Sequence, residues 1–505
     1  EIKAIMNLSR CSIANFGKRL PLAKFWQSSY NYCLPMNVVA QMKKFVEPKS
    51  VAVIGAPRSP MTIYGTVVDV ITNLVGCGYQ GKIYPIHPQA SEIRGLKAYA
   101  SITGAPEDID LAVINLPRDS VPKIVKECVN KGIKAIIIIT QGFADAGDAQ
   151  GKQLQREIDD AIKGTGARIV GPNTFGTANA FINFSSSFWG TEMSKIPVGF
   201  MCQTGVFFVS LAGLKLVGKV IDLGNGSDVD FSDGLAYFEQ DAETKVVGLH
   251  IEGMRDASRF LKQANKVACK KPVVVLKTGR SEQTVRAVQS HTGSLVGRDE
   301  IWDVALKQAG LIRVNDVEEL GDTIRAFYTL PPMMGRKIGI VTWTGGFGIM
   351  GLDACQKSGL EASKLSLAAV NRLSALSPSW QDIGNPADIW PAVGVAKKGS
   401  LFEVLEIAME TFLNDPGVDA ILCILGAFTP AIEINLCQLV EQMAKSHPDK
   451  PLVFYLYGPF ANEIKNKLEG TGKTLVFPSP DKAVRALGHL ADYSEFRTEN
   501  HVAPV

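Results

Sequence analysis

The chain has 505 residues, too many for a single hydrophobic core, and we expect roughly two to four domains. Its hydrophobic share of 46% and its charged share of 20% are those of an ordinary globular protein. The formal net charge of +3 is too small to indicate binding to nucleic acid or to an anionic membrane.

The cysteines and the apolar stretches indicate the kind of cellular compartment in which the protein works. Nine cysteines are scattered without a paired CxxC spacing, which favours reduced thiols over a disulfide framework. The longest apolar stretch, at 420–432, is interrupted by Gly426, Thr429 and Pro430. It therefore predicts a buried strand with its exit loop and not a membrane span. We expect a soluble, cytoplasmic protein.

The first 35 residues are basic and contain serine, and no acidic residue lies between Glu1 and Glu47. Such a composition fits an organellar transit peptide. The alternative is an extension upstream of a start at Met36, which we favour because the first predicted strand follows soon after. We place this N-terminal extension at residues 1–44.

From Val51 onward, short apolar runs alternate with amphipathic helical stretches, which predicts α/β layers with parallel sheets. The first runs are 51–54, 111–114, 135–139 and 169–170, with helical patterns at 121–130 and 152–163 between them. Continuous apolar runs are typical of strands buried on both faces. These elements predict a doubly wound domain at residues 45–180.

Two further α/β units follow. The second, at 181–330, has predicted strands that begin at Val198 and lie at 246–251, 272–276 and 311–314. The third, at 331–505, follows Pro331-Pro332, with predicted strands at 338–342, 420–425, 452–456 and 475–477. Each of the three units opens with a strand, a Gly-containing turn and a helix, at 53–56, 203–205 and 344–348. The start of such a helix can bind anions, so the repetition suggests phosphate-rich ligands.

The strongest local feature is a small, polar, Gly-rich loop at 289–297, ahead of a helix predicted to begin near Asp299. Its His291 has small neighbours that leave the ring accessible, whereas His250 lies in the apolar pattern of a core residue. In an arbitrary protein a loop-capping histidine is the plainer interpretation. An accessible neutral imidazole is also a nucleophile near pH 7.

Several stretches together resemble one enzyme family. They are 271–281 with Ser290-His-Thr-Gly293, Pro48 to Ala56, Gln141 to Phe143, Val170 to Gly176, Gly345-Gly346 and Asn385 to Trp390. Over about residues 45–495, and in the family order, the chain is similar to ADP-forming acyl-CoA synthetases, whose superfamily includes succinyl-CoA synthetase. The resemblance implies a Rossmann-like CoA-binding domain followed by two flavodoxin-like, succinyl-CoA-synthetase-like ligase domains. The first ligase domain would carry a phosphohistidine loop.

The resemblance also implies a reaction. Such ligases interconvert acyl-CoA, ADP and phosphate with acid, ATP and CoA through an acyl phosphate and a phosphohistidine. His291 is expected to carry the phosphoryl group and Glu252 to orient its ring. Gln203, Thr204 and Gly205, at the start of a helix, are expected to bind phosphate. Taken alone, Glu252 is a surface acid, although open α/β sheets bind ligands at the carboxyl ends of their strands.

For coenzyme A, the matching segments are loops that follow strands. The expected contacts are Gly55, Ala56, Pro57, Arg58, Ser59, Pro88, Gln89, Asn115, Pro117, Gln141 and Gly142. The first turn lacks the G-x-G-x-x-G spacing of a dinucleotide fingerprint, and Arg58 is either a phosphate partner or an ordinary loop arginine. Asn173 is assigned to the acyl-phosphate region, although a turn-forming asparagine after proline is equally ordinary.

The sequence departs from the family pattern at several positions. Cys202-Gln-Thr-Gly205 stands for Ser-Gln-Ser-Gly, and His87-Pro-Gln89 stands for Asn-Pro-Lys and loses a cation. Bulky side chains occupy positions where smaller ones are usual: Phe207, Phe208, Trp343 and Phe347. Two outcomes stay open, namely an acyl pocket suited to a larger acid and weaker binding of CoA.

No segment is left over for an ATP-grasp module. We therefore expect an α subunit that works with a separate ATP-grasp β subunit in a hetero-oligomer such as α2β2. ADP or ATP and magnesium would bind through that partner, and we expect no metal site in this chain and no nucleic-acid or membrane partner.

A non-catalytic CoA-binding or sensing protein of the same fold is the alternative, motivated by His87, Gln89 and Phe207. The presence of His291, Glu252 and Thr204-Gly205 favours the enzyme. A third hypothesis, the CoA-binding part of a protein acetyltransferase, lacks support because no acetyltransferase domain follows.

Overall fold

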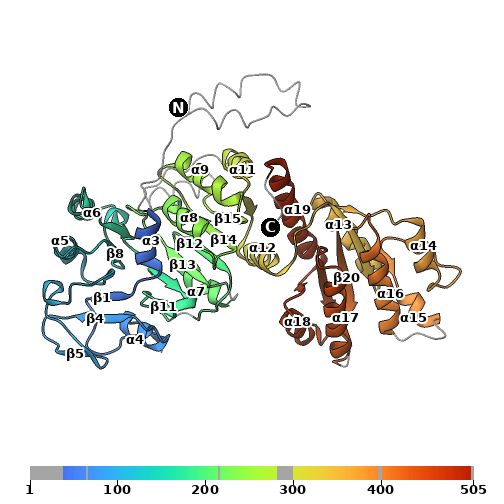
Figure 1. Ribbon diagram of the computed structural model, residues 1–505, viewed down its shortest axis with the longest axis horizontal. Helices are drawn as coiled ribbons and strands as arrows, with labels where there is room; N and C mark the ends of the chain where they lie inside the picture. Colours follow the sequence, from blue (N-terminus) through green and yellow to red (C-terminus); the bar gives the residue numbers. More distant parts are fainter. Residues whose placement is uncertain are drawn as a thin grey trace, which may run out of the picture. The chain divides into compact units, whose positions relative to one another are not determined.

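The computed structural model describes residues 38–63, 66–190, 192–213, 216–280, 299–395, 401–430 and 432–501. They form three mainly parallel sheets with helices packed on them (Figure 1). The predicted α/β fold class is confirmed. The domain boundaries stay predictions, and the 281–298 segment with His291 lies outside the described residues. No helix of the described part is long and apolar enough to cross a membrane.

The first sheet has the order β4-β1-β7-β8-β9, with every pair parallel. Its strands are β1 (Ser50–Ile54), β4 (Lys82–Ile86), β7 (Leu111–Ile114), β8 (Ala135–Ile138) and β9 (Arg168–Val170). Four helices lie around it: α3 (Val38–Val46), α4 (Val70–Gly76), α5 (Val121–Asn130) and α6 (Ala149–Ile162). Four short strands form two antiparallel pairs outside the sheet. In one, β2 (Thr62–Ile63) pairs with β3 (Thr66–Val67), and in the other, β5 (Glu92–Ile93) pairs with β6 (Leu96–Lys97). Strands β1, β7 and β8 are buried along their whole length, as their continuous apolar sequence predicts.

The second sheet has the order β11-β10-β13-β12-β14-β15-β16. Its strands are β10 (Thr177–Asn179), β11 (Phe184–Ser185), β12 (Val198–Cys202), β13 (Lys219–Asp222), β14 (Val246–Ile251), β15 (Val273–Lys277) and β16 (Ile312–Val314). Its helices are α7 (Val206–Gly213), α8 (Phe231–Gln240), α9 (Ala257–Ala268), α11 (Asp299–Gln308) and α12 (Val317–Thr329). The neighbouring strands β13, β12, β14, β15 and β16 are all paired in parallel. The carboxyl ends of β12, β14 and β15 therefore meet at one edge of the sheet.

The third sheet has the order β18-β17-β20-β21-β22, with β19 also paired to β17. Its strands are β17 (Lys337–Thr342), β18 (Glu361–Ala362), β19 (Ala387–Asp388), β20 (Ala420–Gly426), β21 (Leu452–Tyr457) and β22 (Leu475–Phe477). Its helices are α13 (Gly345–Lys357), α14 (Leu367–Ser374), α15 (Trp390–Val395), α16 (Leu401–Asn414), α17 (Ile432–Ser446), α18 (Ala461–Gly470) and α19 (Pro480–Glu499). The apolar stretch near 420 is the fully buried β20, as predicted.

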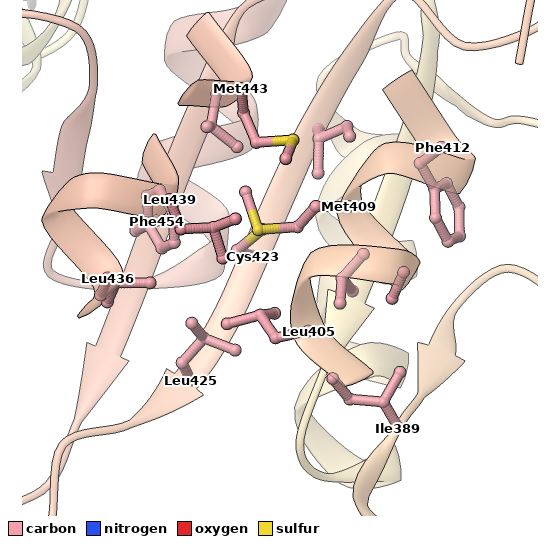
Figure 2. Close-up of a cluster of buried hydrophobic side chains, with 14 of the residues drawn as sticks. Ile389, Leu405, Met409, Phe412, Cys423, Leu425, Leu436, Leu439, Met443 and Phe454 are labelled. Carbon is pink, nitrogen blue, oxygen red and sulfur yellow. The ribbon is translucent and has the colours of Figure 1, made fainter. Parts of the chain in front are cut away.

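Helical spacing builds the core on one face of this third sheet. Leu405, Met409 and Phe412 of α16 recur at intervals of three and four residues and are buried. Figure 2 shows Leu405 and Met409 beside Cys423 and Leu425 of β20, with side chains of α17 completing the cluster.

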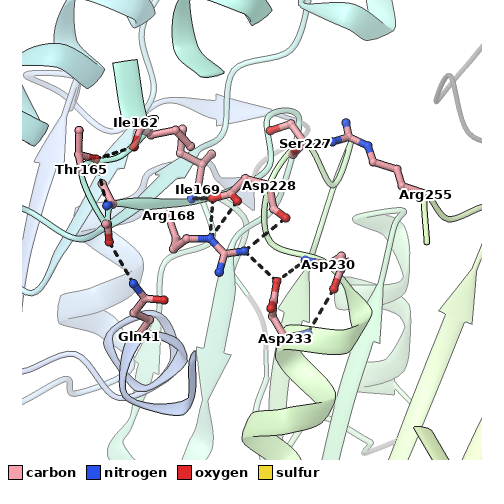
Figure 3. Close-up of polar contacts among 12 residues, drawn as sticks. Gln41, Ile162, Thr165, Arg168, Ile169, Ser227, Asp228, Asp230, Asp233 and Arg255 are labelled. Carbon is pink, nitrogen blue, oxygen red and sulfur yellow. Dashed lines mark hydrogen bonds and ion pairs between the residues drawn. The ribbon is translucent and has the colours of Figure 1, made fainter. Parts of the chain in front are cut away.

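A partly buried ion-pair network joins β9, the last strand of the first sheet, to the loop before α8 and to α8 itself. Arg168 of β9 donates to Asp228 (2.9 Å) and to Asp233 at the start of α8 (2.9 Å), as Figure 3 shows. Asp233 also completes a capping box with Asp230, which fixes the start of α8. Helix α3 is tied to the second sheet by a bond from the Thr177 hydroxyl to the Phe45 carbonyl (2.7 Å). These contacts place the first and second sheets within one compact unit.

Candidate active site

The expected CoA contacts lie at the carboxyl edge of the first sheet. Gly55 follows β1 with a φ of +91°, and a Cβ there would lie 2.1 Å from the carbonyl oxygen of Asn115. Only glycine allows the turns after β1 and β7 to approach so closely. Ala56, Pro57, Arg58 and Ser59 continue the first turn, Pro88 and Gln89 follow β4, Asn115 and Pro117 follow β7, and Gln141 and Gly142 follow β8.

The His87-Pro-Gln89 departure has a local structural consequence. The Nδ1 atom of His87 accepts hydrogen bonds from the backbone N–H groups of Gln89 (3.1 Å) and Ala90 (3.0 Å), so the ring shapes the turn. The Gln89 side chain accepts from the Arg58 guanidinium at 3.0 Å. A cation therefore still lies next to this turn, supplied by the exposed Arg58 instead of a lysine.

The loop after β8 is held by Arg118, which sequence reasoning missed. Gly142 has a φ of +99°, and its carbonyl accepts from the Arg118 guanidinium at 2.9 Å. Arg118 also pairs with Asp148 at 3.0 Å. The backbone N–H groups of Gly142 and Phe143 donate to Asp145 at 3.0 and 2.9 Å. A single arginine after a strand carries no sequence signal for such a role.

A second group of predicted residues meets at the carboxyl edge of the second sheet. The side-chain oxygen of Gln203, after β12, accepts from the backbone N–H groups of Glu252 (2.8 Å) and Gly253 (3.1 Å), after β14. The Thr204 hydroxyl donates to the Glu252 carboxylate. The structure thus brings Gln203, Thr204 and Glu252 together, because β12 and β14 are parallel neighbours.

Helix α7 begins directly beside this carboxylate. A Cβ on Gly205 would lie 2.4 Å from the Phe175 ring, so glycine permits close packing at the helix start. The first N–H groups of an α-helix have no acceptor within it, and they favour an anion. In α7 the N–H groups of Phe207 and Phe208 already donate to the carbonyl oxygens of Thr204 (3.1 Å) and Gly205 (3.0 Å), so the donors for a phosphate next to Glu252 would be the N–H groups ahead of them, at Gly205 and Val206.

Asn173 lies in a separate polar chain that links the two sheets. It follows the cis Gly171–Pro172 peptide with a φ of +59°, and its side-chain amide donates to the side-chain oxygen of Asn225 at 3.4 Å. Asn225 in turn donates to Asp145 at 2.8 Å. No described contact joins Asn173 to Glu252, so the structure connects it to the loop after β8.

Asp222, at the end of β13, was missed and organises the same region. Its carboxylate is fully buried and accepts from the backbone N–H groups of Phe175 (2.7 Å) and Gly224 (3.2 Å). Burial raises its pKa to about 6, and these two hydrogen bonds oppose that shift. The carboxylate therefore joins the segment after Asn173 to the turn after β13.

The side chains that are bulkier than the family pattern mostly pack against other side chains. Phe208 is fully buried in the second core, so it is a packing residue and not an open pocket wall. Phe207 stacks on His250 with ring centroids 4.0 Å apart. His250 is a core histidine, as predicted, and burial lowers its pKa to about 4. Trp343 is buried in the third core, and Phe347 packs edge-on against Tyr455.

Comparison with known proteins places this geometry in a family. Residues 49–180 match the profile of a CoA binding domain, and residues 195–327 match that of a succinyl-CoA ligase like flavodoxin domain. The chain is 32% identical over 470 residues to the α subunit of the ADP-forming acetate–CoA ligase I of Pyrococcus furiosus, which covers 91% of this chain and 99% of that subunit.

The chain belongs to the family of ADP-forming acetate–CoA ligases.

Other members of this ligase family extend the comparison. The ADP-forming acetate–CoA ligase of Methanocaldococcus jannaschii is 36% identical over 460 residues, and the match covers 90% of this chain and 63% of that ligase. The solved structure of the dinucleotide forming acetyl-coenzyme A synthetase 1 of Ca. Korarchaeum cryptofilum, in complex with phosphate and ADP, is 27% identical with a TM-score of 0.81. That match covers 92% of this chain and 99% of the solved chain. The predicted resemblance is confirmed.

Proposed function

We propose that this chain is the α subunit of an ADP-forming acyl-CoA synthetase that carries a phosphoryl group on His291. The observation that carries the proposal is the convergence of Gln203, Thr204 and Glu252 at the start of α7, in a chain of this ligase family. A scaffold that only binds CoA has no need of a carboxylate held in this way.

The proposed reaction proceeds in three balanced steps. A phosphate oxygen attacks the thioester carbonyl of acyl-CoA, the carbon–sulfur bond breaks, and the CoA thiolate takes up a proton. The phosphoryl group of the acyl phosphate then moves to a ring nitrogen of His291, and the acid leaves as its carboxylate. Attack by ADP on the phosphohistidine gives ATP and frees the histidine.

Each set of residues has a role in this proposal. Glu252 accepts a hydrogen bond from the His291 ring and so stabilises its orientation while the other ring nitrogen is phosphorylated. Gln203, Thr204 and Gly205 place phosphate at the start of α7. Asn173 contacts the acyl phosphate from the polar chain between the sheets, and CoA binds along Gly55 to Ser59 and the loops after β4, β7 and β8.

The remaining assignments concern location and partners. We propose a CoA-binding domain at 45–180, ligase domains at 181–330 and 331–505, and a cytoplasmic location. ADP and magnesium bind on an ATP-grasp β subunit. Support comes from the α-subunit name of the P. furiosus relative and from the additional length of the M. jannaschii ligase.

The test is turnover with a candidate ATP-grasp partner. The purified chain is mixed with that partner, ADP, magnesium, phosphate and a panel of acyl-CoA thioesters, and CoA release and ATP formation are followed together. Equal amounts of both products with one or more thioesters support the proposal and identify the acyl group. CoA binding without turnover of any thioester would replace it with the CoA-sensing alternative.

A further inference from the structure

A buried lysine lies at the carboxyl edge of the second sheet, next to Glu252. Lys277 is the last residue of β15 and is 1% exposed. Its Nζ donates to the backbone carbonyl oxygen of Glu252 at 2.9 Å and also to that of Thr278. Because Glu252 and Thr278 follow neighbouring strands, a single ammonium group ties the ends of β14 and β15 together.

The Lys277 ammonium has no carboxylate at ion-pair distance among the described residues. The Trp302 ring of α11 lies 5.7 Å from it, within the range of a cation–π contact. Burial lowers the pKa of Lys277 to about 8, while Asp299 and Glu252 raise it and Arg313 and Arg280 lower it. A buried charge without an anionic partner is unfavourable. Among the described residues, two backbone carbonyl oxygens and the Trp302 ring hold this charge.

The contacts of Glu252 suggest a role for this lysine, because three residues hold Glu252 at different atoms. Gln203 binds its backbone N–H, Lys277 binds its backbone carbonyl, and Thr204 binds its carboxylate. A carboxylate that orients a catalytic ring must keep its place to within about 0.5 Å. Without Lys277, the carbonyl side of this residue would lose its anchor.

We propose that Lys277 is a positioning residue for phosphoryl transfer, which fixes the backbone of Glu252 so that its carboxylate stays at the start of α7. The inference rests on the proposed function of Glu252 and His291. It assigns Lys277 no contact with the reacting atoms.

The test compares Lys277→Met with Lys277→Arg. Methionine fills similar space but donates no hydrogen bond, whereas arginine keeps the donors. We expect Lys277→Met to lower the rate of phosphoenzyme formation from acyl-CoA and phosphate by roughly 10- to 100-fold, as is typical when an outer support of a reactive group is lost. The KM for acyl-CoA and the Kd for CoA stay unchanged, because the CoA contacts lie on the first sheet. Lys277→Arg restores most of the rate.

Lys271, two residues before the opposite end of β15, supplies a matched control. Its Nζ also donates to two backbone carbonyl oxygens, those of Phe238 (2.6 Å) and Asp241. Lys271→Met therefore removes comparable bonds far from Glu252. We expect it to lower thermal stability without changing the rate of phosphoenzyme formation.

Three results would overturn the inference while wild-type phosphoenzyme formation shows that the proposed function holds. They are a folded Lys277→Met variant with the wild-type rate, a Lys271→Met variant that loses the rate equally, and a rate loss that Lys277→Arg does not relieve. Should Lys277→Met not fold, Lys277→Gln takes its place, and a wild-type rate there has the same meaning. Absence of phosphoenzyme in the wild type would instead contradict the proposed function itself.

Discussion

The side-chain oxygen of Gln203 accepts hydrogen bonds from the backbone N–H groups of Glu252 at 2.8 Å and of Gly253 at 3.1 Å. Through this contact the loop after β12 holds the loop after β14. The Thr204 hydroxyl, one residue further along, then reaches the Glu252 carboxylate. Two consecutive residues thus fix both the backbone and the side chain of the proposed orienting acid.

The Thr204 hydroxyl provides the first prediction. Thr204→Val keeps the shape but removes the donor to Glu252, and we expect phosphoenzyme formation to slow by roughly 10- to 100-fold. Thr204→Ser keeps the hydroxyl and should stay within about threefold of the wild type. Rapid-quench measurement of both variants checks this, and equal rates for valine and serine would show that the hydroxyl has no part in the reaction.

Gly55 provides a prediction about CoA binding. A Cβ on Gly55 would lie 2.1 Å from the Asn115 carbonyl oxygen, so Gly55→Ala should separate the turns after β1 and β7 and weaken CoA binding at least about tenfold. Gly132→Ala is the control, because Gly132 also has a positive φ, +89°, but nothing lies within 4 Å of its added Cβ. Calorimetric titration with CoA measures both variants. Similar affinities would place the CoA site elsewhere.

Gly224 provides a prediction about stability. Its φ is +52°, and a Cβ would lie 2.4 Å from the carbonyl oxygens of both Pro172 and Asn173. Gly224→Ala should therefore lower the free energy of unfolding by about 3 kcal/mol, from strain and overpacking together. At Gly226 the φ is +57°, and the nearest atom lies 3.9 Å from an added Cβ. Gly226→Ala should therefore lower the free energy of unfolding by only about 1 kcal/mol. Denaturant titration separates the two, and equal losses would contradict the close approach at Gly224.

From the lowered pKa of His250 we expect the stability of the protein to depend on pH. Burial lowers its pKa in the folded protein to about 4 from an ordinary value of 6.5. Between pH 4 and pH 6.5 the unfolded chain binds the proton more tightly than the folded protein does. The free energy of unfolding therefore falls by roughly 3 kcal/mol as the pH falls from 6.5 to 4. His250→Gln should remove that loss. Asp222, whose pKa is raised to about 6, contributes with the opposite sign in both proteins, so the difference between wild type and variant isolates His250.

Much of the fold could be predicted from the sequence, because buried parallel strands are continuous apolar runs. The predicted strands 246–251 and 475–477 coincide with β14 and β22. Strand β13 was missed, since Lys219-Val-Ile-Asp222 has only two apolar residues and its lysine and aspartate are buried through pairing and hydrogen bonding.

The candidate site could be predicted in part. Gln203, Thr204 and Glu252 were assigned to one site by resemblance, and the pairing of β12 with β14 explains why residues about fifty positions apart meet. The role of Lys277 could not be predicted, because a lysine at the end of an apolar run is normally the exposed end of a strand. Its burial depends on Trp302 and on the carbonyl of Glu252, which only the folded chain brings to it.

Phosphorylation of His291 tests the central claim most directly. Wild type and His291→Ala are incubated with acyl-CoA and radiolabelled phosphate, and protein-bound label is measured after acid and after base treatment. We predict label on the wild type that is labile in acid and stable in base, and none on His291→Ala. Equal labelling of both proteins, or no label on the wild type even when an ATP-grasp partner and ATP are supplied, would contradict the phosphohistidine mechanism.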